Sequence, residues 1–505
     1  MKRHTILPVA GLLAAILALT ACSSSDDGQG SEPTHGGSLT IGLDTDLTSL
    51  DPADNLVTSQ STLVAGNAIY EPLFVDGAGG SLEPRLAESI ETDDLVEWTL
   101  TLKPGLTFSD GSPLDSAAVI AHLERMAAPD STCLCQPVAA AITELEAVDD
   151  VTVAITLEDS DASFDRNLTR AMGMITSTDA TGVDGSPLGA GAFTVASSEP
   201  GASVTLERNP EYHGDDSYVD ELVFQFLPDT DSRYQSLSAG NIDIAWINTA
   251  NLITQAQTEG YTTAIANSAT ATAFLNTQQA PFDDIRVRQA VQAAIDREVL
   301  LQVADQGVGN ISDGPINSGS PYAEEAIYPA FDPDRATELL DDYGQPVTFS
   351  YTTDARPQSA QRATAIQQML DDVGIEMTID TVDAATLDTR LTTRDFDAIE
   401  FFTSAYGETD SAMSGIFMKD APGNFSGYAS DEATDLIQQA AGTVDEDARG
   451  ELYRSASEII VNDAPVLFFT ESPSGFAATG QVGGIPDLSD RNVISILPSE
   501  LWITA

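Results

Sequence analysis

Polar and aromatic side chains follow several predicted strands, and loops after strands are where α/β proteins keep many of their ligand contacts. Trp246 offers an aromatic wall for a bound molecule, although burial in the core is the alternative for this side chain. Asn276 either reaches a cleft or caps the turn at Pro281. The candidates of this kind are Asp46, Trp246, Asn248 and Asn276.

A second group of candidates lies between Phe402 and Ser411. It contains an aromatic residue, Tyr406, and two acids, Glu408 and Asp410. A buried carboxylate is a strong partner for a ligand ammonium group, since both are charged and hydrogen bonded. In a chain with so many acids, a solvated acidic loop is the alternative.

The sequence lacks the usual constellations of catalysis. It contains no Gly-x-Ser-x-Gly and no His-Glu-x-x-His motif, and no lysine follows a glycine, so a phosphate-binding loop cannot be built. The four histidines, His4, His35, His122 and His213, lie far apart. We therefore predict no enzyme, no cofactor and no metal site. A secreted hydrolase with a pair of carboxylates is the alternative from a different class.

Charge and length limit the classes of partner. The 505 residues suffice for two or three domains, and a hydrophobic share of 42% allows a sizeable core. With 21 basic and 79 acidic side chains, the formal net charge is -58. Such a surface repels phosphate backbones, which excludes nucleic acid as a partner. The acids are spread along the chain, which favours solubility at high ionic strength over one acidic site.

The amino terminus predicts export. Two basic residues precede an apolar run that is too short for a spanning helix, so residues 1–21 are expected to be a signal peptide. The run ends in Leu-Thr-Ala-Cys, which resembles the lipobox of bacterial lipoproteins. This resemblance implies lipidation of Cys22, followed by a flexible tether over residues 22–37. The protein is then anchored to the cell membrane and faces the extracytoplasmic side.

Two further cysteines, Cys133 and Cys135, are one residue apart. Export permits a disulfide, but the ring would be small, and two free thiols are the alternative. Neither arrangement implies a function.

Phe274–Leu301 predicts a strand, a tight turn and an amphipathic helix, within a chain where helices and strands alternate as in layered α/β folds. Asp283 or Asp284 is expected to cap this helix. Its predicted buried face consists of Val287, Ala290, Val291, Ala294 and Ile295. We expect three of its arginines, Arg286, Arg288 and Arg297, to pair with neighbouring acids. Other predicted strands include Ser38–Leu43, Ile242–Ile244, Ile375–Asp380 and Asp397–Phe402.

As a string, Phe274–Leu301 resembles the signature of the family 5 solute-binding proteins, the dipeptide and oligopeptide binders of bacterial ABC importers. Pro84–Ser89, Trp98–Pro113 and Asn209–Trp246 resemble further blocks of the same family. The resemblance implies a two-lobed periplasmic-binding-protein type II fold with an inserted subdomain. It also implies a monomer that closes on a peptide-like solute and delivers it to an ABC permease. A nickel chelate or a sugar oligomer is the alternative ligand.

The resemblance also implies how the chain divides. Lobe I is expected to contain residues 38–57, 187–261 and 474–505, the inserted subdomain residues 58–186, and lobe II residues 262–473. In the peptide binders that resemble this chain, one acid in the stretch corresponding to Phe402–Ser411 pairs with the amino terminus of the peptide. Asp410 matches that acid and Glu408 is a substitute for it, whereas the family's tryptophan is missing and Ser411 replaces its proline.

Overall fold

The structure is a computed structural model that describes residues 33–504, apart from positions 34, 48, 55–58, 78–80, 134, 179, 215–216, 324–326, 405–408 and 489–493. The predicted signal peptide and Cys22 lie outside the described residues. Residues 33–505 form one compact unit by their internal contacts. Within the described ranges, we find no helix with the length and apolar composition needed to cross a bilayer.

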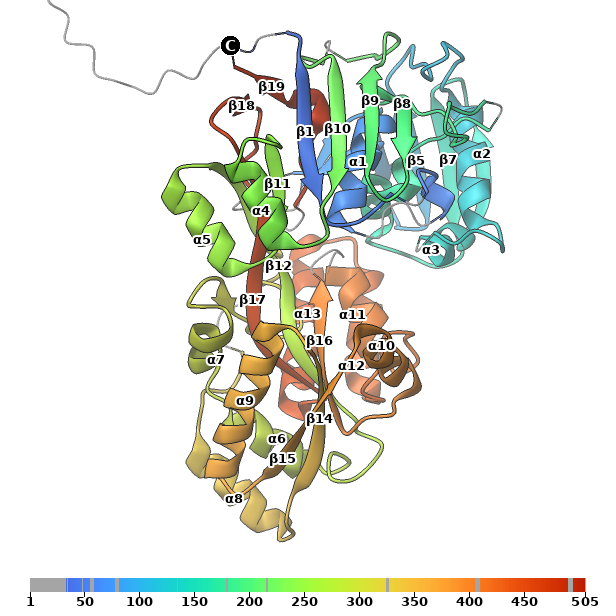
Figure 1. Cartoon of the computed structure of the whole chain (residues 1–505). Helices are drawn as coiled ribbons and strands as arrows, with labels where there is room; N and C mark the ends of the chain where they lie inside the picture. Colours follow the sequence, from blue (N-terminus) through green and yellow to red (C-terminus); the bar gives the residue numbers. More distant parts are fainter. Residues whose placement is uncertain are drawn as a thin grey trace, which may run out of the picture. The chain divides into compact units, whose positions relative to one another are not determined.

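One mixed sheet runs through both lobes, in the order β15-β14-β16-β12-β17-β11-β1-β10-β9-β8, with β13 paired to β17. Its two longest strands, β12 (Thr262–Leu275) and β17 (Val466–Ala478), lie antiparallel along most of their length (Figure 1). β12 pairs with β16 of lobe II, and β17 pairs with β11 of lobe I. The pair shows two shifts of register, between Asn267 and Ala269 and between Thr270 and Thr272, where the chain passes from one lobe to the other.

Lobe I is the part built on β1 and β8–β11. β1 pairs in parallel with β10 and β11, whereas β8, β9 and β10 are antiparallel. Successive strand residues face opposite sides, so Trp246 and Ile244 join one core cluster while Ala245 and Ile247 join another, which α4 and α5 cover. The elements are β1 (Ser38–Leu43), α1 (Gln60–Ile69), β8 (Phe193–Glu199), β9 (Ser203–Arg208), β10 (Glu221–Phe226), α4 (Thr230–Ser238), β11 (Ile244–Ile247), α5 (Ala250–Glu259), β18 (Val482–Gly483), η5 (Pro498–Glu500) and β19 (Trp502–Ile503).

The inserted subdomain has a separate antiparallel sheet in the order β4-β5-β7-β6 and its own core cluster. Helix α1, which we had placed in this subdomain, packs instead in the core of β1 and β10, because Leu63, Val64 and Ala68 belong to that cluster. The elements are η1 (Pro52–Asp54), β2 (Phe74–Asp76), β3 (Leu82–Pro84), β4 (Ala87–Thr92), β5 (Glu97–Leu102), α2 (Ser116–Ala127), α3 (Gln136–Ala140), β6 (Ile142–Ala147), β7 (Thr152–Leu157), η3 (Phe164–Thr169) and η4 (Ala171–Gly173).

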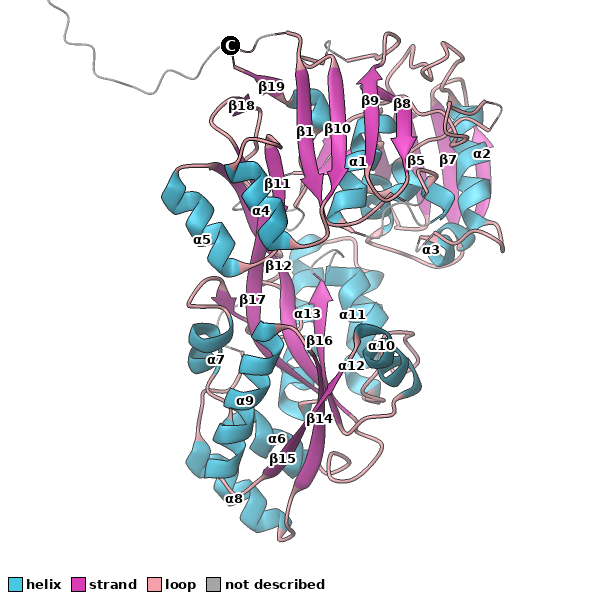
Figure 2. Cartoon of the chain, in the orientation of Figure 1, coloured by secondary structure: helices cyan, strands magenta, loops and turns pink. Residues whose placement is uncertain are grey.

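Lobe II is the part built on β12 and β14–β16, and helices cover both faces of its sheet (Figure 2). Along β12, Ala273 and Leu275 point into one cluster and Phe274 into the other, as the two-residue period of a strand requires. The elements are α6 (Ile285–Ala294), α7 (Arg297–Ala304), β13 (Asn310–Ile311), α8 (Pro333–Tyr343), β14 (Thr348–Asp354), α9 (Pro357–Asp372), β15 (Glu376–Val382), α10 (Ala384–Thr393), β16 (Ala398–Ser404), α11 (Thr409–Phe417), α12 (Asp431–Ala441) and α13 (Glu446–Asp463).

The predicted strand–turn–helix unit is present. Asp284 is the N-cap of α6 and accepts a hydrogen bond from the Arg286 backbone amide, and all five residues of the predicted apolar face are buried. Our expectation for the arginines is wrong in two of three cases. Arg286 pairs with Asp284, but Arg288 donates to the carbonyls of Phe282 and Asp463, and Arg297 lies over the Tyr328 ring. The buried Arg288 and the partly buried Arg297 donate to backbone carbonyl oxygens, which the ends of helices and strands leave without backbone partners.

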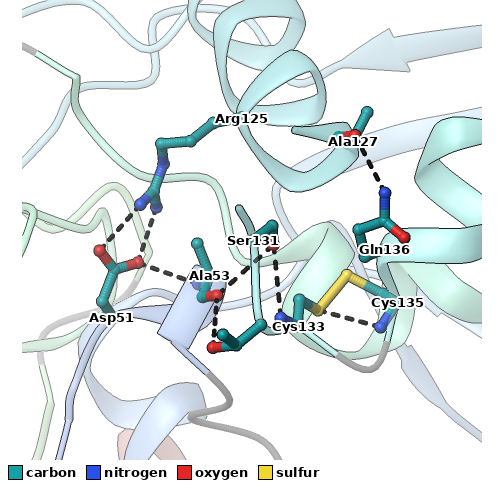
Figure 3. Close-up of a disulfide and its surroundings, with 9 residues drawn as sticks. Asp51, Ala53, Arg125, Ala127, Ser131, Cys133, Cys135 and Gln136 are labelled. Atoms are coloured by element: carbon teal, nitrogen blue, oxygen red, sulfur yellow. Dashed lines mark hydrogen bonds and ion pairs between the residues drawn. A yellow bond between two sulfur atoms is a disulfide. The ribbon is translucent and has the colours of Figure 1, made fainter. Parts of the chain in front are cut away.

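A disulfide joins Cys133 and Cys135 (Figure 3). The loop that carries it is tied to the segment after β1: Thr132 donates its backbone amide to the Ala53 carbonyl at 3.1 Å. Beside it, Arg125 forms two hydrogen bonds of 2.8 Å with the Asp51 carboxylate (Figure 3). The disulfide therefore lies where the end of α2 packs against the chain around Asp51.

Candidate functional site

A cavity of about 620 Å³ lies in lobe II where three parallel strands end. β14 pairs in parallel with both β15 and β16, so the carboxyl ends of these strands meet at one edge of the sheet. Ligands of open α/β sheets bind outside that edge. The lining residues are Asp354, Ala355, Arg356, Pro357, Val382, Asp383, Leu387, Asp388, Glu400, Phe401 and Phe402.

Helix starts shape one side of this cavity. Asp354 ends β14, and its carboxylate accepts the Arg356 backbone amide at 2.9 Å and the Arg356 Nε at 2.6 Å, at the first turn of α9. Asp383 caps α10 by accepting the Thr386 amide at 2.9 Å. Both acids thus satisfy backbone amides that a helix leaves free at its amino end. The strand-to-helix connections hold these charged groups at the cavity rim.

Arg356 is the basic residue among those that line the cavity. Its guanidinium carbon lies 4.3 Å from the centre of the Phe402 ring, and its side chain is 55% exposed. The guanidinium therefore keeps N–H groups accessible while the aromatic ring and Asp354 restrict its orientation. An exposed, oriented guanidinium next to an apolar wall can pair with the carboxylate of a bound molecule.

Glu400, on the cavity wall, belongs to a buried ionic network. Its two carboxylate oxygens accept hydrogen bonds from Arg362 of α9 and Thr353 of β14. On its other side, Arg362 forms an ion pair of 3.5 Å with Asp305. Asp305 in turn accepts hydrogen bonds from Thr470 at 2.7 Å and Ser472 at 3.0 Å. The network therefore connects the cavity wall to β17, next to the register shift where the chain crosses between lobes.

Burial governs the protonation of this network. Burial raises the pKa of Glu400, while the positive charge of Arg362 and the Thr353 hydrogen bond oppose that rise. Burial alone would lower the pKa of Arg362, but the charges of Glu400 and Asp305 raise it above its usual value. The guanidinium stays charged because it faces two carboxylates in a medium of low polarity.

The structure places two of the predicted site residues inside the fold. β11 extends to Ile247, past the strand end that we expected at Ile244, so Trp246 lies within the strand and packs on Phe476 with ring centres 5.0 Å apart. Trp246 is therefore a core residue. Asn276 is also buried, and its side-chain amide donates to the Arg394 and Phe396 carbonyls while its oxygen accepts the Gln278 amide. Its contacts are those of a turn.

Asp46 and Asn248 have more accessible positions. Asp46 accepts the Gly201 backbone amide at 2.9 Å, and the exposed Asn248 accepts a hydrogen bond from Thr230 at 2.8 Å. Tyr406 and Glu408 lie outside the described residues, in the gap at 405–408 that follows β16 and the cavity residues Phe401 and Phe402. Asp410 is in the first turn of α11.

Another buried acid, Glu71, lies in lobe I and is not among the cavity residues. Glu71 accepts a hydrogen bond from the Tyr212 hydroxyl at 2.9 Å, and its other oxygen is 3.3 Å from His213 Nε2. Its φ of 50° places it in the left-handed region, which is strained for a residue with a side chain. Burial raises the pKa of Glu71 to about 7, and burial lowers the pKa of His213 to about 4. Near pH 6 Glu71 is therefore protonated and His213 is uncharged, so the acidic proton of this pair lies on the Glu71 carboxyl group.

Sequence reasoning missed most of the groups that surround the cavity. We did not predict β14, although Thr348–Asp354 carries the aromatic and β-branched residues of a strand, and Arg356-Pro357 follows it at a strand-to-helix connection. Glu400 stood within a predicted apolar strand, which is a signal for a buried acid. The pairing of Glu400 with Arg362 had no local signal, because these residues are 38 positions apart.

A search for three or more metal-ligating side chains close enough to hold an ion finds none among the described residues.

Comparison with known proteins decides the family. The family model of the bacterial extracellular solute-binding proteins, family 5 (middle), matches residues 81–425, more than half of the chain. The chain belongs to this family. The resemblance carried by Phe274–Leu301 and the other blocks is thereby confirmed.

Relatives match along nearly the whole length of this family 5 substrate-binding protein. The glutathione-binding protein GsiB of Pectobacterium atrosepticum is 26% identical over 484 residues, which cover 92% of this chain and 91% of the relative. The ABC transporter substrate-binding protein CtaP of Listeria monocytogenes superposes with a TM-score of 0.81 at 22% identity, covering 94% of this chain and 100% of the other.

A peptide complex has the same fold. The periplasmic binding protein DppA of Helicobacter pylori, solved with the peptide STSA, superposes with a TM-score of 0.76 at 23% identity and covers 94% of this chain and 99% of that one. The predicted two-lobed fold is confirmed by these neighbours.

Proposed function

We propose that this chain is an extracytoplasmic receptor that binds a peptide-like solute and delivers it to the permease of an ABC transporter. The match to a glutathione-binding protein over 92% of the chain is the observation that carries this proposal. Glutathione, a tripeptide with two carboxylates and one amine, is therefore the first ligand to test.

The cavity in lobe II supplies contacts that suit such a solute. Val382, Leu387 and Phe402 give an apolar wall, and Arg356 gives a guanidinium that can exchange Asp354 for a ligand carboxylate. We propose that this cavity is the part of the site that lobe II contributes. Asp46 of lobe I and Asp410 of α11 remain our candidates for polar contacts, with Asp410 as the partner of a ligand amine. Tyr406 and Glu408 stay predictions.

Binding is proposed to close the lobes by rotation about the crossing strands. In this proposal residues 38–57, 187–261 and 474–505 form one lobe, residues 262–473 the other, and residues 58–186 the insertion, except that α1 joins the first lobe and η1 joins the insertion. A ligand that contacts both lobes stabilises the closed conformation because only that conformation offers both sets of contacts. The protein acts as a monomer in this account.

Anchoring is a separate part of the proposal. Cys22, after the signal peptide, is proposed to carry lipid and to hold the receptor at the outer face of the cell membrane. Expression in bacteria tests this: the chain should partition into detergent with an acyl mass at Cys22, and Cys22→Ser should release it in soluble form. Equal detergent partitioning of both chains would contradict the anchor.

Calorimetric titration tests the ligand. We expect glutathione and S-methylglutathione to bind to one saturable site, with Arg356→Gln weakening both by about tenfold, which is the loss of one charge-assisted hydrogen bond. Arg335→Gln, at an exposed arginine paired with Glu338, is the matched control and should bind like the unchanged protein. Absence of binding by both tripeptides and by a panel of dipeptides would contradict a peptide-like ligand.

A further inference from the structure

Two loops far apart in the sequence, neither of them part of β12 or β17, are in contact. Residues 160–163 follow β7 in the inserted subdomain, and residues 441–443 lie at the end of α12, where the chain turns toward α13 in lobe II. The backbone amide of Ala162 donates a hydrogen bond of 3.1 Å to the carbonyl of Ala441. This hydrogen bond puts the two loops in direct contact, and Ala162 itself is buried in the core of the inserted subdomain.

The loop in the inserted subdomain is held in shape by its own contacts. Asp161 accepts the Ser163 amide at 2.8 Å and the Ser163 hydroxyl at 2.7 Å, and its backbone amide donates to the Leu95 carbonyl at 3.0 Å. These bonds fix the backbone so that the Ala162 amide points outward, toward lobe II. The loop needs little ordering when the contact forms, which favours a contact that forms and breaks.

The loop in lobe II is also fixed. Thr443 donates its amide to the Ala440 carbonyl at 2.9 Å and its hydroxyl to the Gln439 carbonyl at 2.6 Å, and the buried Arg449 donates to the Thr443 carbonyl at 3.1 Å. Between these anchors Gly442 has a φ of -96°, which any residue adopts. A side chain at Gly442 would place its Cβ 3.0 Å from the Ser160 hydroxyl oxygen. The glycine therefore allows the close approach of the two loops.

We infer that residues 160–162 and 441–442 form a latch between the inserted subdomain and lobe II, made when the receptor closes and broken when it opens. This inference rests on the proposed function, because it assumes that ligand binding rotates the lobes. β12 and β17 cross between the lobes as one antiparallel pair with two register shifts, and rotation at these shifts leaves the pairing on either side in place. The two loops belong to different lobes, so in this account a rotation of the lobes moves their backbones apart and breaks the hydrogen bond between Ala162 and Ala441. The latch therefore adds stability to the ligand-bound conformation alone.

A pair of cysteines tests the contact. In the full chain, with the native Cys133–Cys135 disulfide in place, Ser160→Cys and Gly442→Cys are combined, and each single variant serves as the control for exchange with native cysteines. Mild oxidation should give an intramolecular cross-link between residues 160 and 442 in the double variant only. Saturating S-methylglutathione, which has no free thiol, should accelerate this reaction about tenfold by shifting the population toward the closed form.

The outcomes separate the latch from the proposed function. No cross-link, or one whose rate is the same with a ligand that calorimetry shows to bind, would overturn the latch. If the unchanged chain binds none of the peptides in calorimetry, the proposed function fails, while formation of the cross-link still decides whether the loops meet.

A wedge variant gives a second measurement. Gly442→Leu inserts a side chain into the contact and should weaken S-methylglutathione binding about fivefold without lowering the thermal midpoint of the free protein, because the closed form alone makes the contact. Gly480→Leu is the matched control, since no atom lies within 4 Å of a Cβ built there. Unchanged affinity of Gly442→Leu would contradict the latch.

Discussion

Glu71 in lobe I and Glu400 in lobe II are both buried glutamates, but Glu400 has a cation in contact with its carboxyl group and Glu71 has neutral groups. Glu400 directly faces Arg362, a fully buried guanidinium that Asp305 also contacts. Glu71 faces the neutral hydroxyl of Tyr212 and the imidazole of His213, while the positive charges of Arg85 and Lys103 act on it only through space. Burial raises the pKa of both acids.

The comparison shows that one protein can contain a buried acid beside a cation and another buried acid without one. A carboxylate can stay ionised inside a protein when a cation and hydrogen-bond donors replace water. Where no cation is in contact, burial keeps the acid protonated above its ordinary pKa, as the pKa of about 7 for Glu71 indicates. The stability of the lobe II network therefore depends on the ion pair between Glu400 and Arg362. The stability contributed by the lobe I cluster of Glu71, Tyr212 and His213 depends on pH.

Removal of Arg362 should have the largest effect on stability. Arg362→Met leaves two buried carboxylates without their cation, and the free energy of unfolding should fall by about 3–5 kcal/mol. Urea denaturation at pH 7 measures it. The double variant Arg362→Met with Glu400→Gln should lose less, since one of the stranded charges is gone. Equal losses in the two variants would show that the stranded charge of Glu400 is not the cause.

The buried Glu71 of lobe I should make the free energy of unfolding depend on pH. The folded chain keeps the Glu71 proton at pH values where the unfolded chain, with a pKa of 4.5, has lost it, so stability falls as pH rises from about 4.5 through about 7. The shift corresponds to about 3 kcal/mol over that range, of which about 1 kcal/mol lies above pH 6.5. Glu71→Gln, which cannot ionise, should remove this decline in urea denaturation from pH 6.5 to 8.

His213 acts in the opposite direction over part of the range. Its folded pKa of about 4 lies below its usual 6.5, so the unfolded chain binds the extra proton and stability rises with pH between these values. His213→Asn should therefore reduce the rise of stability with pH between about 4 and 6.5, whereas His122, which is buried and has a pKa lowered to about 3, keeps its own contribution to that rise. If the dependence of stability on pH were the same for His213→Asn and the unchanged chain, the lowered pKa of His213 beside protonated Glu71 would be contradicted.

The smallest effect is expected at a surface ion pair. Arg286 pairs with Asp284 at 2.6 Å, but its side chain is 42% exposed, so water competes for both charges. Arg286→Gln should lower the free energy of unfolding by at most about 1 kcal/mol, and 1 M salt should remove most of that difference. A loss as large as that of Arg362→Met would mean that burial is not what separates the two arginines.

The elements that could be predicted from the sequence are those whose signals are local. The periodic apolar face of α6 and its cap at Asp284 follow from residues within one helix, and both are present. Side-chain partners could not be predicted in the same way, because they come from distant parts of the chain. Arg288 and Arg297 donate to backbone oxygens, and Arg362 contacts Glu400 and Asp305 from two other elements.

The candidate site residues could also be predicted only in part. The strand predicted to end at Ile244 places Trp246 after it, whereas the observed strand runs three residues further, to Ile247, and makes Trp246 the core residue that was the alternative. Lipidation of Cys22, the lobe boundaries and the role of Asp410 stay predictions.

Hydrogen–deuterium exchange with and without saturating ligand tests the central claim most directly. If this family 5 protein binds a peptide-like solute at the lobe II cavity, S-methylglutathione should slow exchange in peptides that cover residues 354–357, 383–388 and 400–402, where the cavity lining lies. The same ligand should leave peptides from α8, which contributes no residue to that lining, unchanged. Binding with no protection at the three cavity segments would contradict the account.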